Sequence, residues 1–275
     1  MSATSPAPSA PSAASPRASS TWIRAFHPSA PTGDPQGQRS APRMICFPHA
    51  GGAATYYFPV SRALAGKIEV LAVQYPGRQD RHTEPAVNDV EALAARVFPE
   101  LPLDDPGRTW FFGHSMGAAV AFEVARLVER ELGRPLAGLI VSGRRAPSHF
   151  RGETVHQQGD DDFLASVQKL GGTDPAAFAD PEVRRLFLPT LRADYQAIET
   201  YRPAGLPHVT CPVHAFVGDD DPLTTLDEAD SWRDHTKGPF SLRVFPGNHF
   251  YLTSRADDVI GEISDLLLPG TPTAP

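Results

Sequence analysis

The sequence has little of what secreted, membrane or nucleic-acid-binding proteins need. It has only two cysteines in 275 residues, Cys46 and Cys211, and both stand in apolar runs. Two such cysteines do not form a disulfide framework and are expected as reduced core residues. No apolar run approaches the roughly 18 residues of a membrane span. The 25 basic residues are outnumbered by 32 acidic ones, which argues against a general nucleic-acid binder. We therefore expect a cytoplasmic protein that engages neither membranes nor nucleic acids.

Signals for targeting and for cofactors are also missing. Residues 1–20 consist mostly of serine, proline and alanine, and they lack the apolar centre of a secretory signal. Such a segment buries too little surface to offset its ordering entropy, so we expect a disordered N-terminal tail. Residues 269–275 are expected to form a short C-terminal tail. The chain shows no zinc-ligand spacing, no phosphate-binding glycine loop with lysine and no dinucleotide fingerprint, so we expect no cofactor or metal.

What the sequence does contain is a regular alternation of two kinds of segment. Nearly continuous apolar runs predict strands buried on both faces, as in a parallel sheet. These runs are Met44–Pro48, Glu69–Gly77, Thr109–Gly113, Gly138–Gly143, Val213–Gly218 and Ser241–Gly247. Segments with apolar residues at helical spacing accompany them, at 87–98, 118–132 and 257–268. The alternation predicts an α/β fold with a doubly wound, mostly parallel sheet.

One interval interrupts this alternation. Between Gly143 and Val213 no convincing strand occurs, but residues 160–170 and 181–201 have helical spacing. An insertion of this length is too long for a bare loop in a compact domain. We interpret residues 150–205 as a helical lid over a site, with an ordinary extra helical layer as the alternative. The whole of 21–268 would then be one domain with a lid.

The sequence Gly113-His114-Ser115-Met116-Gly117 stands where a predicted strand meets a predicted helix. It matches G-x-S-x-G, the sharp turn that lifts a serine hydroxyl above a sheet. The glycines leave room two residues before and after Ser115, and the alanines that follow let the helix begin close to the sheet. We predict that Ser115 is a nucleophile; a serine in a purely structural turn is the alternative.

A serine nucleophile needs a base and a group that orients the base. In this fold the chain order is serine, acid, histidine. His249 follows the last predicted strand and is the best placed of the ten histidines. Three aspartates follow the preceding strand, of which Asp221 is our choice for the acid and Asp220 the second candidate. A solvated turn is the alternative explanation of these aspartates.

Backbone N–H groups should stabilise the negative charge that develops during the attack. One donor would be Met116, the residue after the nucleophile. The other should come from the loop after the first predicted strand, where the pair Gly51-Gly52 lets amides turn inward, so Ala50 or Gly51 is expected there. His49 and His114 are interpreted as orienting or packing groups rather than bases.

Together these segments resemble the type II thioesterases, stand-alone α/β-hydrolases that accompany polyketide and non-ribosomal peptide synthases. The resemblance runs from about residue 22 to 268, and the pair "FPHAGG" and "QYPGR" is its most specific part. The segments that carry it are "CFPHAGGAATYYFPV", "VQYPGRQDR", "FFGHSMGAAVAFE", "SGRRAP", "LPTLRADYQAIETY", "GDDDP" and "NHFYL". One departure is Gly247-Asn248-His249, where the family usually reads Gly-Gly-His; asparagine tolerates unusual backbone angles, so we expect the loop to keep its shape.

The resemblance implies hydrolysis of acyl thioesters on the phosphopantetheine arm of an acyl carrier protein or peptidyl carrier domain. The usual role is editing, the removal of aberrant or stalled acyl groups. By matching positions, Ser115 is the nucleophile, His249 the base, Asp221 the orienting acid, and Ala50 and Met116 the oxyanion donors. The pantetheine belongs to the substrate, so no cofactor is implied, and we expect a monomer.

Two other functions fit parts of the same pattern. A chain-releasing thioesterase or acyltransferase, or a general carboxylesterase, would have the same fold and the same three residues. A non-catalytic binding module could keep the fold, but it would not need a serine, an acid and a histidine in this order.

Overall fold

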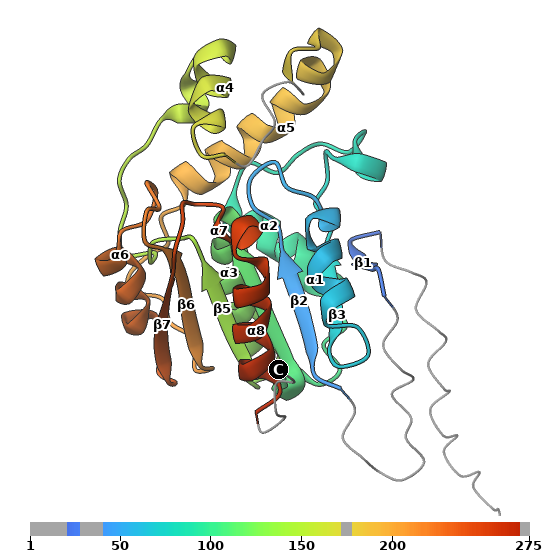
Figure 1. Cartoon of the computed structure of the whole chain (residues 1–275), viewed down its shortest axis with the longest axis vertical. Coiled ribbons are helices and arrows are strands. Elements are labelled where there is room, and N and C mark those ends of the chain that lie inside the picture. Colours follow the sequence, from blue (N-terminus) through green and yellow to red (C-terminus); the bar gives the residue numbers. More distant parts are fainter. Residues whose placement is uncertain (1–20, 28–40, 172–177, 270–275) are drawn as a thin grey trace, which may run out of the picture.

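A single sheet of seven strands organises the computed structural model, which describes residues 21–27, 41–171 and 178–269 (Figure 1). The strand order is β1-β3-β2-β4-β5-β6-β7, with β1 antiparallel to β3 and all other neighbours parallel. The prediction of a mostly parallel α/β sheet is confirmed. The strands are β1 (Ile23–Ala25), β2 (Arg43–Phe47), β3 (Glu69–Val73), β4 (Thr109–His114), β5 (Gly138–Ser142), β6 (Val213–Gly218) and β7 (Phe240–Phe245). The tails predicted at 1–20 and 269–275 lie outside the described residues, apart from residue 269.

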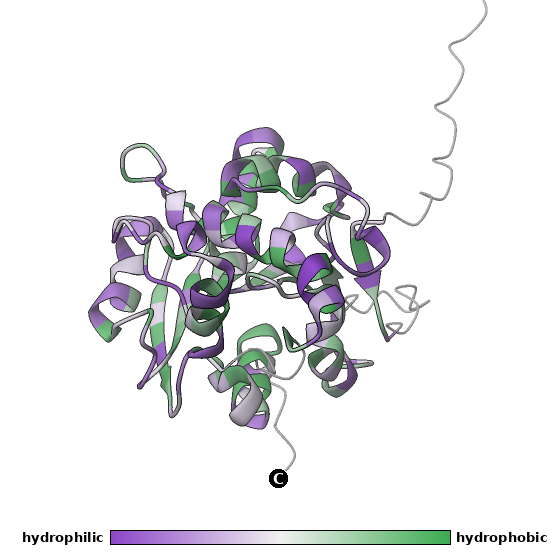
Figure 2. Cartoon of the chain, turned by 90° about the horizontal axis from the view of Figure 1, so that it is seen from above, coloured by the Kyte–Doolittle hydropathy of each residue, from purple (hydrophilic) through white to green (hydrophobic). Residues whose placement is uncertain are grey.

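Helices pack on both faces of this sheet and at its upper end (Figure 1). The α-helices are α1 (Phe58–Ala63), α2 (Val90–Val97), α3 (Met116–Leu132), α4 (Asp160–Gln168), α5 (Pro181–Thr200), α6 (Leu226–Asp230), α7 (Tyr251–Ser254) and α8 (Ala256–Leu267). Each of the five helical segments predicted from periodicity overlaps one of them, namely α2, α3, α4, α5 or α8. Viewed from above, hydrophobic and hydrophilic stretches lie side by side along these helices, as expected of amphipathic elements (Figure 2).

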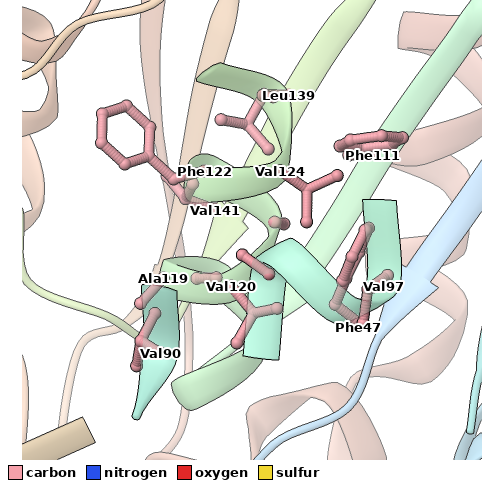
Figure 3. Close-up of a cluster of buried hydrophobic side chains, with 14 of the residues drawn as sticks. Phe47, Val90, Val97, Phe111, Ala119, Val120, Phe122, Val124, Leu139 and Val141 are labelled. Atoms are coloured by element: carbon pink, nitrogen blue, oxygen red, sulfur yellow. The ribbon is translucent and has the colours of Figure 1, made fainter. Parts of the chain in front are cut away.

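Alternation along the strands divides the core into two layers. On one face, Ile45 and Phe111 belong to a cluster that packs against α2 and α3, part of which is drawn in Figure 3. On the other face, Met44 and Phe112 belong to a cluster that packs against α1 and α8. Successive strand residues point to opposite faces, so a strand needs apolar residues at every position to fill both layers. This is why the central strands are continuous apolar runs. Cys46 and Cys211 are both buried and free, as predicted.

The two edges of the sheet differ from the sequence-based expectation. β1, of three residues, gave no periodic signal and was not predicted; it pairs with β3 from Ile23↔Val73 to Ala25↔Leu71. β7 was expected to be buried on both faces, and this is wrong, because Ser241, Arg243 and Val244 are exposed and only Phe245 is buried. The strand is at the sheet edge, and its outward Arg243 pairs with Glu262 of α8 at 3.1 Å.

The insertion between β5 and β6 forms α4 and α5, which lie above the end of the sheet toward which the parallel strands point (Figure 1). Apolar side chains from both helices form a small core of their own, and Phe163 is fully buried in it. Leu186 and Phe187, in the first half of α5, are exposed. Among the described residues of this insertion, the only β-bridge is the isolated one that Val209 forms with Thr236, a residue between β6 and β7. In the described part of the chain as a whole, no helix is long and apolar enough to span a bilayer.

Candidate active site

The turn at Ser115 joins β4 to α3 at the upper edge of the sheet. Ser115 has φ 54° and ψ −120°. This backbone conformation is unfavourable for a residue other than glycine, so the surrounding structure must hold it in place. Its N–H donates to the carbonyl of Ser142 on β5 at 2.8 Å. A Cβ on Gly113 would lie 2.3 Å from the Gly117 carbonyl oxygen, and one on Gly117 would lie 2.0 Å from the Phe47 carbonyl oxygen. Both glycines are therefore required by close backbone approach, and Ser115 is presented above β4.

The side chains of Ser115, His249 and Asp221 form one hydrogen-bonded row. His249 Nε2 lies 3.0 Å from Ser115 Oγ, and His249 Nδ1 lies 2.9 and 3.0 Å from the two Asp221 carboxylate oxygens. A carboxylate accepts only, so Nδ1 carries the proton and Nε2 is left to accept from the serine hydroxyl. His249 is 2% exposed, which keeps competing water away from the ring. The three predicted side chains are thus brought together.

The sequence left Asp220 and Asp221 as alternatives, and the turn after β6 separates them. The Asp221 side chain points to His249 and also accepts the N–H of Leu223 at 2.8 Å. Asp220 is exposed, and its N–H donates to the Gly247 carbonyl at 3.0 Å. Asp219 accepts the N–H of Gly247 at 2.8 Å. Two of the three aspartates therefore connect β6 to residues 246–250, the loop that carries His249 and is called the histidine loop below, while Asp221 alone contacts the His249 ring.

The histidine loop keeps its shape in a different way from the one expected. Gly247 takes the positive φ, 132°, and Asn248 is not among the described non-glycine residues with positive φ. Asn248 instead accepts the N–H of Phe250 with its side-chain oxygen at 3.0 Å. The asparagine thus forms an Asx turn just before α7 rather than supplying an unusual backbone angle.

The loop after β2 faces the nucleophile from the neighbouring strand. Gly51 has φ 73°, and Gly52 closes a turn by donating to the His49 carbonyl at 2.9 Å. The N–H of Gly51 donates to the carboxylate of Asp194 at 2.7 Å, so it is not available to an oxyanion. Of the two alternative donors, Ala50 and Gly51, we therefore retain Ala50. Ala50 lines the same cavity as Ser115, and Met116 is the first residue of α3. β2 and β4 are neighbours where the strand order reverses, the usual place of a ligand site in open α/β sheets.

A buried ion pair connects α5 to this loop. Arg78 Nη1 and Nη2 each lie 2.8 Å from a different carboxylate oxygen of Asp194. Arg78 Nη1 also donates to the Gly52 carbonyl at 2.9 Å, and the two side chains are only 4% and 1% exposed. The sequence analysis assigned no role to either residue. The available signal was their position in the segments "QYPGR" and "LRADY".

His49 and His114 pack beside the ring of His249 as uncharged groups. Burial lowers the pKa of His49 to about 3, with a smaller contribution from His249, and burial lowers the pKa of His114 well below its usual value. The His114 ring lies 5.1 Å from that of His249, and its Nδ1 lies 3.0 Å from Ser142 Oγ. A neutral ring in this position supports His249 without adding a second positive charge, in agreement with the packing role expected for both residues.

A cavity of about 130 Å³ opens in front of Ser115 and His249. Its walls come from the loops after β2, β5 and β6, the histidine loop, and the helices α4 and α5. The other lining residues are His49, Ala50, Arg144, Arg145, Glu153, Val155, Ser166, Val167, Leu170, Tyr195, Ile198, Glu199, Leu223 and Phe250. Among the described residues, no group of histidine, cysteine, aspartate or glutamate side chains is arranged to hold a metal ion. The arrangement as a whole can activate a hydroxyl for attack on a carbonyl carbon.

Comparisons with known proteins agree with this chemistry. Residues 42–267 match the family described as Thioesterase domain. The chain is 49% identical over 251 residues to thioesterase PikA5 of Streptomyces venezuelae, covering 91% of this chain and 86% of that protein. It is 48% identical over 249 residues to a probable cadicidin biosynthesis thioesterase of Streptomyces griseus, covering 90% of this chain and 66% of that protein. The solved structure of the type II thioesterase BorB from the borrelidin biosynthetic cluster superposes with a TM-score of 0.81 at 47% identity, covering 91% and 99% of the two chains.

Proposed function

This chain belongs to the thioesterase family, and on that premise we propose that it is a type II thioesterase acting on acyl groups held by a carrier protein. The carrier is an acyl carrier protein or a peptidyl carrier domain of a polyketide or non-ribosomal peptide synthase. The reaction is the hydrolytic removal of aberrant or stalled acyl groups from the phosphopantetheine thiol. The observation that carries the proposal is the row of Ser115, His249 and Asp221 at the cavity.

In the proposed reaction Ser115 Oγ attacks the thioester carbonyl carbon while His249 Nε2 takes the hydroxyl proton. The carbon–sulfur bond then breaks, and the leaving thiol receives that proton from His249. Water next attacks the acyl-serine carbonyl and gives a proton to His249, which passes it to the departing Ser115 oxygen. The products are the free acid and the free pantetheine thiol. Asp221 holds the imidazole in the required tautomer and stabilises the imidazolium.

The amides of Ala50 and Met116 are proposed to bind the oxygen that becomes negative in both tetrahedral intermediates. Loss of one such donor typically costs about 3 kcal/mol of transition-state stabilisation. The Met116 amide is at the N-terminus of α3, whose aligned peptide dipoles favour negative charge there. Backbone amides cannot be removed by side-chain substitution, so their positions depend on the glycines of the loop after β2 and of the turn at Ser115.

The size of the cavity favours a short acyl group as the substrate. The cavity, about 130 Å³, is below the roughly 300 Å³ at which drug-sized ligand pockets begin. The helices α4 and α5 contribute Val167 and Ile198 to its wall, which supports the interpretation of residues 150–205 as a lid.

The monomeric state and the cytoplasmic location expected from the sequence remain predictions. Light scattering after size-exclusion chromatography tests the monomeric state.

The test uses a purified acyl carrier protein loaded with acetyl or propionyl thioester, with deacylation followed by mass spectrometry. We expect release by the native enzyme and none above background by Ser115→Ala. Equal release by that variant, or no release by the native enzyme, would contradict the proposal. A p-nitrophenyl ester of the same acyl group is run in parallel, because faster hydrolysis of the oxygen ester would favour a general carboxylesterase.

A further inference from the structure

Ser142, the last residue of β5, connects the turn at Ser115 to the loop that carries His249. Its backbone carbonyl accepts the N–H of Ser115 at 2.8 Å. Its side-chain oxygen lies 2.6 Å from the hydroxyl oxygen of Tyr251, which is the first residue of α7 and the second residue after His249. Ser142 and Tyr251 are both fully buried, so water does not compete for this hydrogen bond. A single residue of the sheet is therefore bonded on the side of the nucleophile and on the side of the base.

Tyr251 is joined to His249 by a short backbone turn. The N–H of Tyr251 donates to the Asn248 carbonyl at 3.1 Å, so His249 and Phe250 lie inside a closed turn. The Tyr251 ring stacks on Phe245, with centroids 5.2 Å apart and planes 11° from parallel. Burial raises the pKa of Tyr251, so the phenol keeps its proton at pH 7. Because the ring is held by stacking, its hydroxyl gives the turn around His249 a fixed point of attachment to β5.

The end of β5 also packs against the imidazole rings. A Cβ on Gly143, which has φ 57°, would lie 2.6 Å from His114 Cε1 and 3.4 Å from His249 Cε1. Ser142 Oγ lies 3.0 Å from His114 Nδ1, so the same hydroxyl also fixes the ring that packs beside His249. On its other side the histidine loop is held to β6 by the hydrogen bonds of Gly247. Ser142 thus supplies the restraint on the β5 side of the loop.

We propose that Ser142 is a positioning residue that, together with Tyr251, sets the distance between Ser115 Oγ and His249 Nε2. Its carbonyl acts on the side of the nucleophile and its hydroxyl on the side of the base. This deepens the proposed function and rests on the part of it that makes Ser115 the nucleophile. A displacement of about 1 Å between reacting groups can lower a rate about 10²-fold, so loss of the Ser142 hydroxyl should lower kcat. Neither Ser142 nor Tyr251 is among the described residues that line the cavity, so KM should change little.

The test measures two rates in Ser142→Ala and Tyr251→Phe: deacylation of acetyl thioester on a purified acyl carrier protein, and labelling of Ser115 by a fluorophosphonate. Each substitution removes one hydroxyl and keeps the backbone carbonyl and the stacked ring. For each variant we expect kcat to fall about tenfold or more, with KM within about threefold of native and the labelling rate reduced by a similar factor. In the double variant kcat should fall no further than in Ser142→Ala, because both substitutions remove the same hydrogen bond.

Two matched controls remove hydroxyls of the same kind elsewhere in the chain. Ser61→Ala removes a buried serine hydroxyl that lies 3.0 Å from His27 Nδ1. Tyr201→Phe removes a buried tyrosine hydroxyl that donates to Glu123. Both controls lose a buried hydrogen bond, so their stability in urea should fall as it does in the test variants. Their kcat per folded molecule should stay within about twofold of native.

The outcomes separate this inference from the function on which it rests. A fall in kcat well below tenfold in either test variant, or an equal fall in the controls, would overturn the role of Ser142 while the thioesterase function stands. Losses that multiply in the double variant would overturn it too, since the two hydroxyls would then act independently. Tyr251→Phe keeps the inference testable even where Ser142→Ala fails to fold, which circular dichroism would reveal. If the native enzyme is labelled but hydrolyses no carrier-bound thioester, the proposed substrate is wrong, and the labelling rates still decide the role of Ser142.

Discussion

Replacement of Asp194 by alanine is expected to cost stability far more than catalysis. Asp194 is 1% exposed and is bonded to both terminal nitrogens of Arg78 and to the N–H of Gly51. The variant leaves the Arg78 guanidinium charged and buried, with only backbone carbonyls to accept from it. Neither residue contacts the hydrogen-bonded row of Ser115, His249 and Asp221.

The size of the effect follows from the burial of the pair. Removing one partner of a buried ion pair typically destabilises a protein by about 3–5 kcal/mol, because the remaining charge is uncompensated. In a chain of this size each kcal/mol lowers the melting temperature by about 2–4 °C, so a decrease on the order of 10 °C is expected. The matched control is Glu182→Ala, which breaks an exposed pair with Arg185 on the same helix and should change stability by less than about 1 kcal/mol.

Urea unfolding measured by circular dichroism, together with deacylation rates at a temperature where both forms are folded, distinguishes the alternatives. We expect Asp194→Ala to lose most of its stability margin while its kcat per folded molecule falls less than tenfold. The double variant Arg78→Met/Asp194→Leu should be more stable than Asp194→Ala, since it leaves no buried charge. Native-like stability combined with a loss of activity above a hundredfold would refute this reasoning and make the pair part of the catalytic machinery.

Three further predictions concern the acid, the nucleophile turn and pH. Asp221→Asn should lower kcat by about 10⁴-fold in the deacylation assay, with Asp220→Asn near native; the reverse pattern would exchange their roles. Gly117→Ala should destabilise by about 3 kcal/mol or more in urea, because its Cβ would lie 2.0 Å from the β2 backbone, whereas Gly261→Ala in α8 meets nothing within 4 Å and should be neutral or stabilising. The His49 pKa of about 3 lies below the 6.5 of the unfolded chain, so the unfolded state binds the extra proton and stability falls as pH drops below 6.5. His49→Gln should reduce this loss by up to about 1.4 kcal/mol per pH unit in urea titrations at pH 7, 6 and 5; an unchanged slope would refute it.

The sheet and the candidate site residues could be predicted from the sequence for the same reason. Parallel strands end at one edge, so side chains that directly follow β4, β6 and β7 had to meet there. This logic brought Ser115 and His249 together across 134 positions of sequence. It could not choose between Asp220 and Asp221, since the choice depends on how one turn is held by Gly247.

Other features could not be predicted from local periodicity or composition. Arg78 and Asp194 are 116 positions apart in the sequence. Taken singly, each has the sequence context of an ordinary surface charge, and their pairing appears only when α5 is placed over the loop after β2. The strand β1 is too short for periodicity, and its register is set by β3. The exposure of β7 follows from its edge position, which composition does not encode. Long-range pairing and edge position therefore account for what was missed.

The bond between α5 and the β2 loop also limits how this enzyme can be rebuilt. The second half of α5 carries Asp194, whose partners Arg78 and Gly51 belong to the scaffold, so residues 150–205 cannot be exchanged between related thioesterases as an independent unit. A graft that ends before Pro189 of α5 keeps this connection and replaces only the outer part of the insertion. A graft that extends through the helix must bring an aspartate to the same position or replace both charges together. The part of the insertion before Pro189 can thus be exchanged, whereas the rest of α5 is bonded to the catalytic domain.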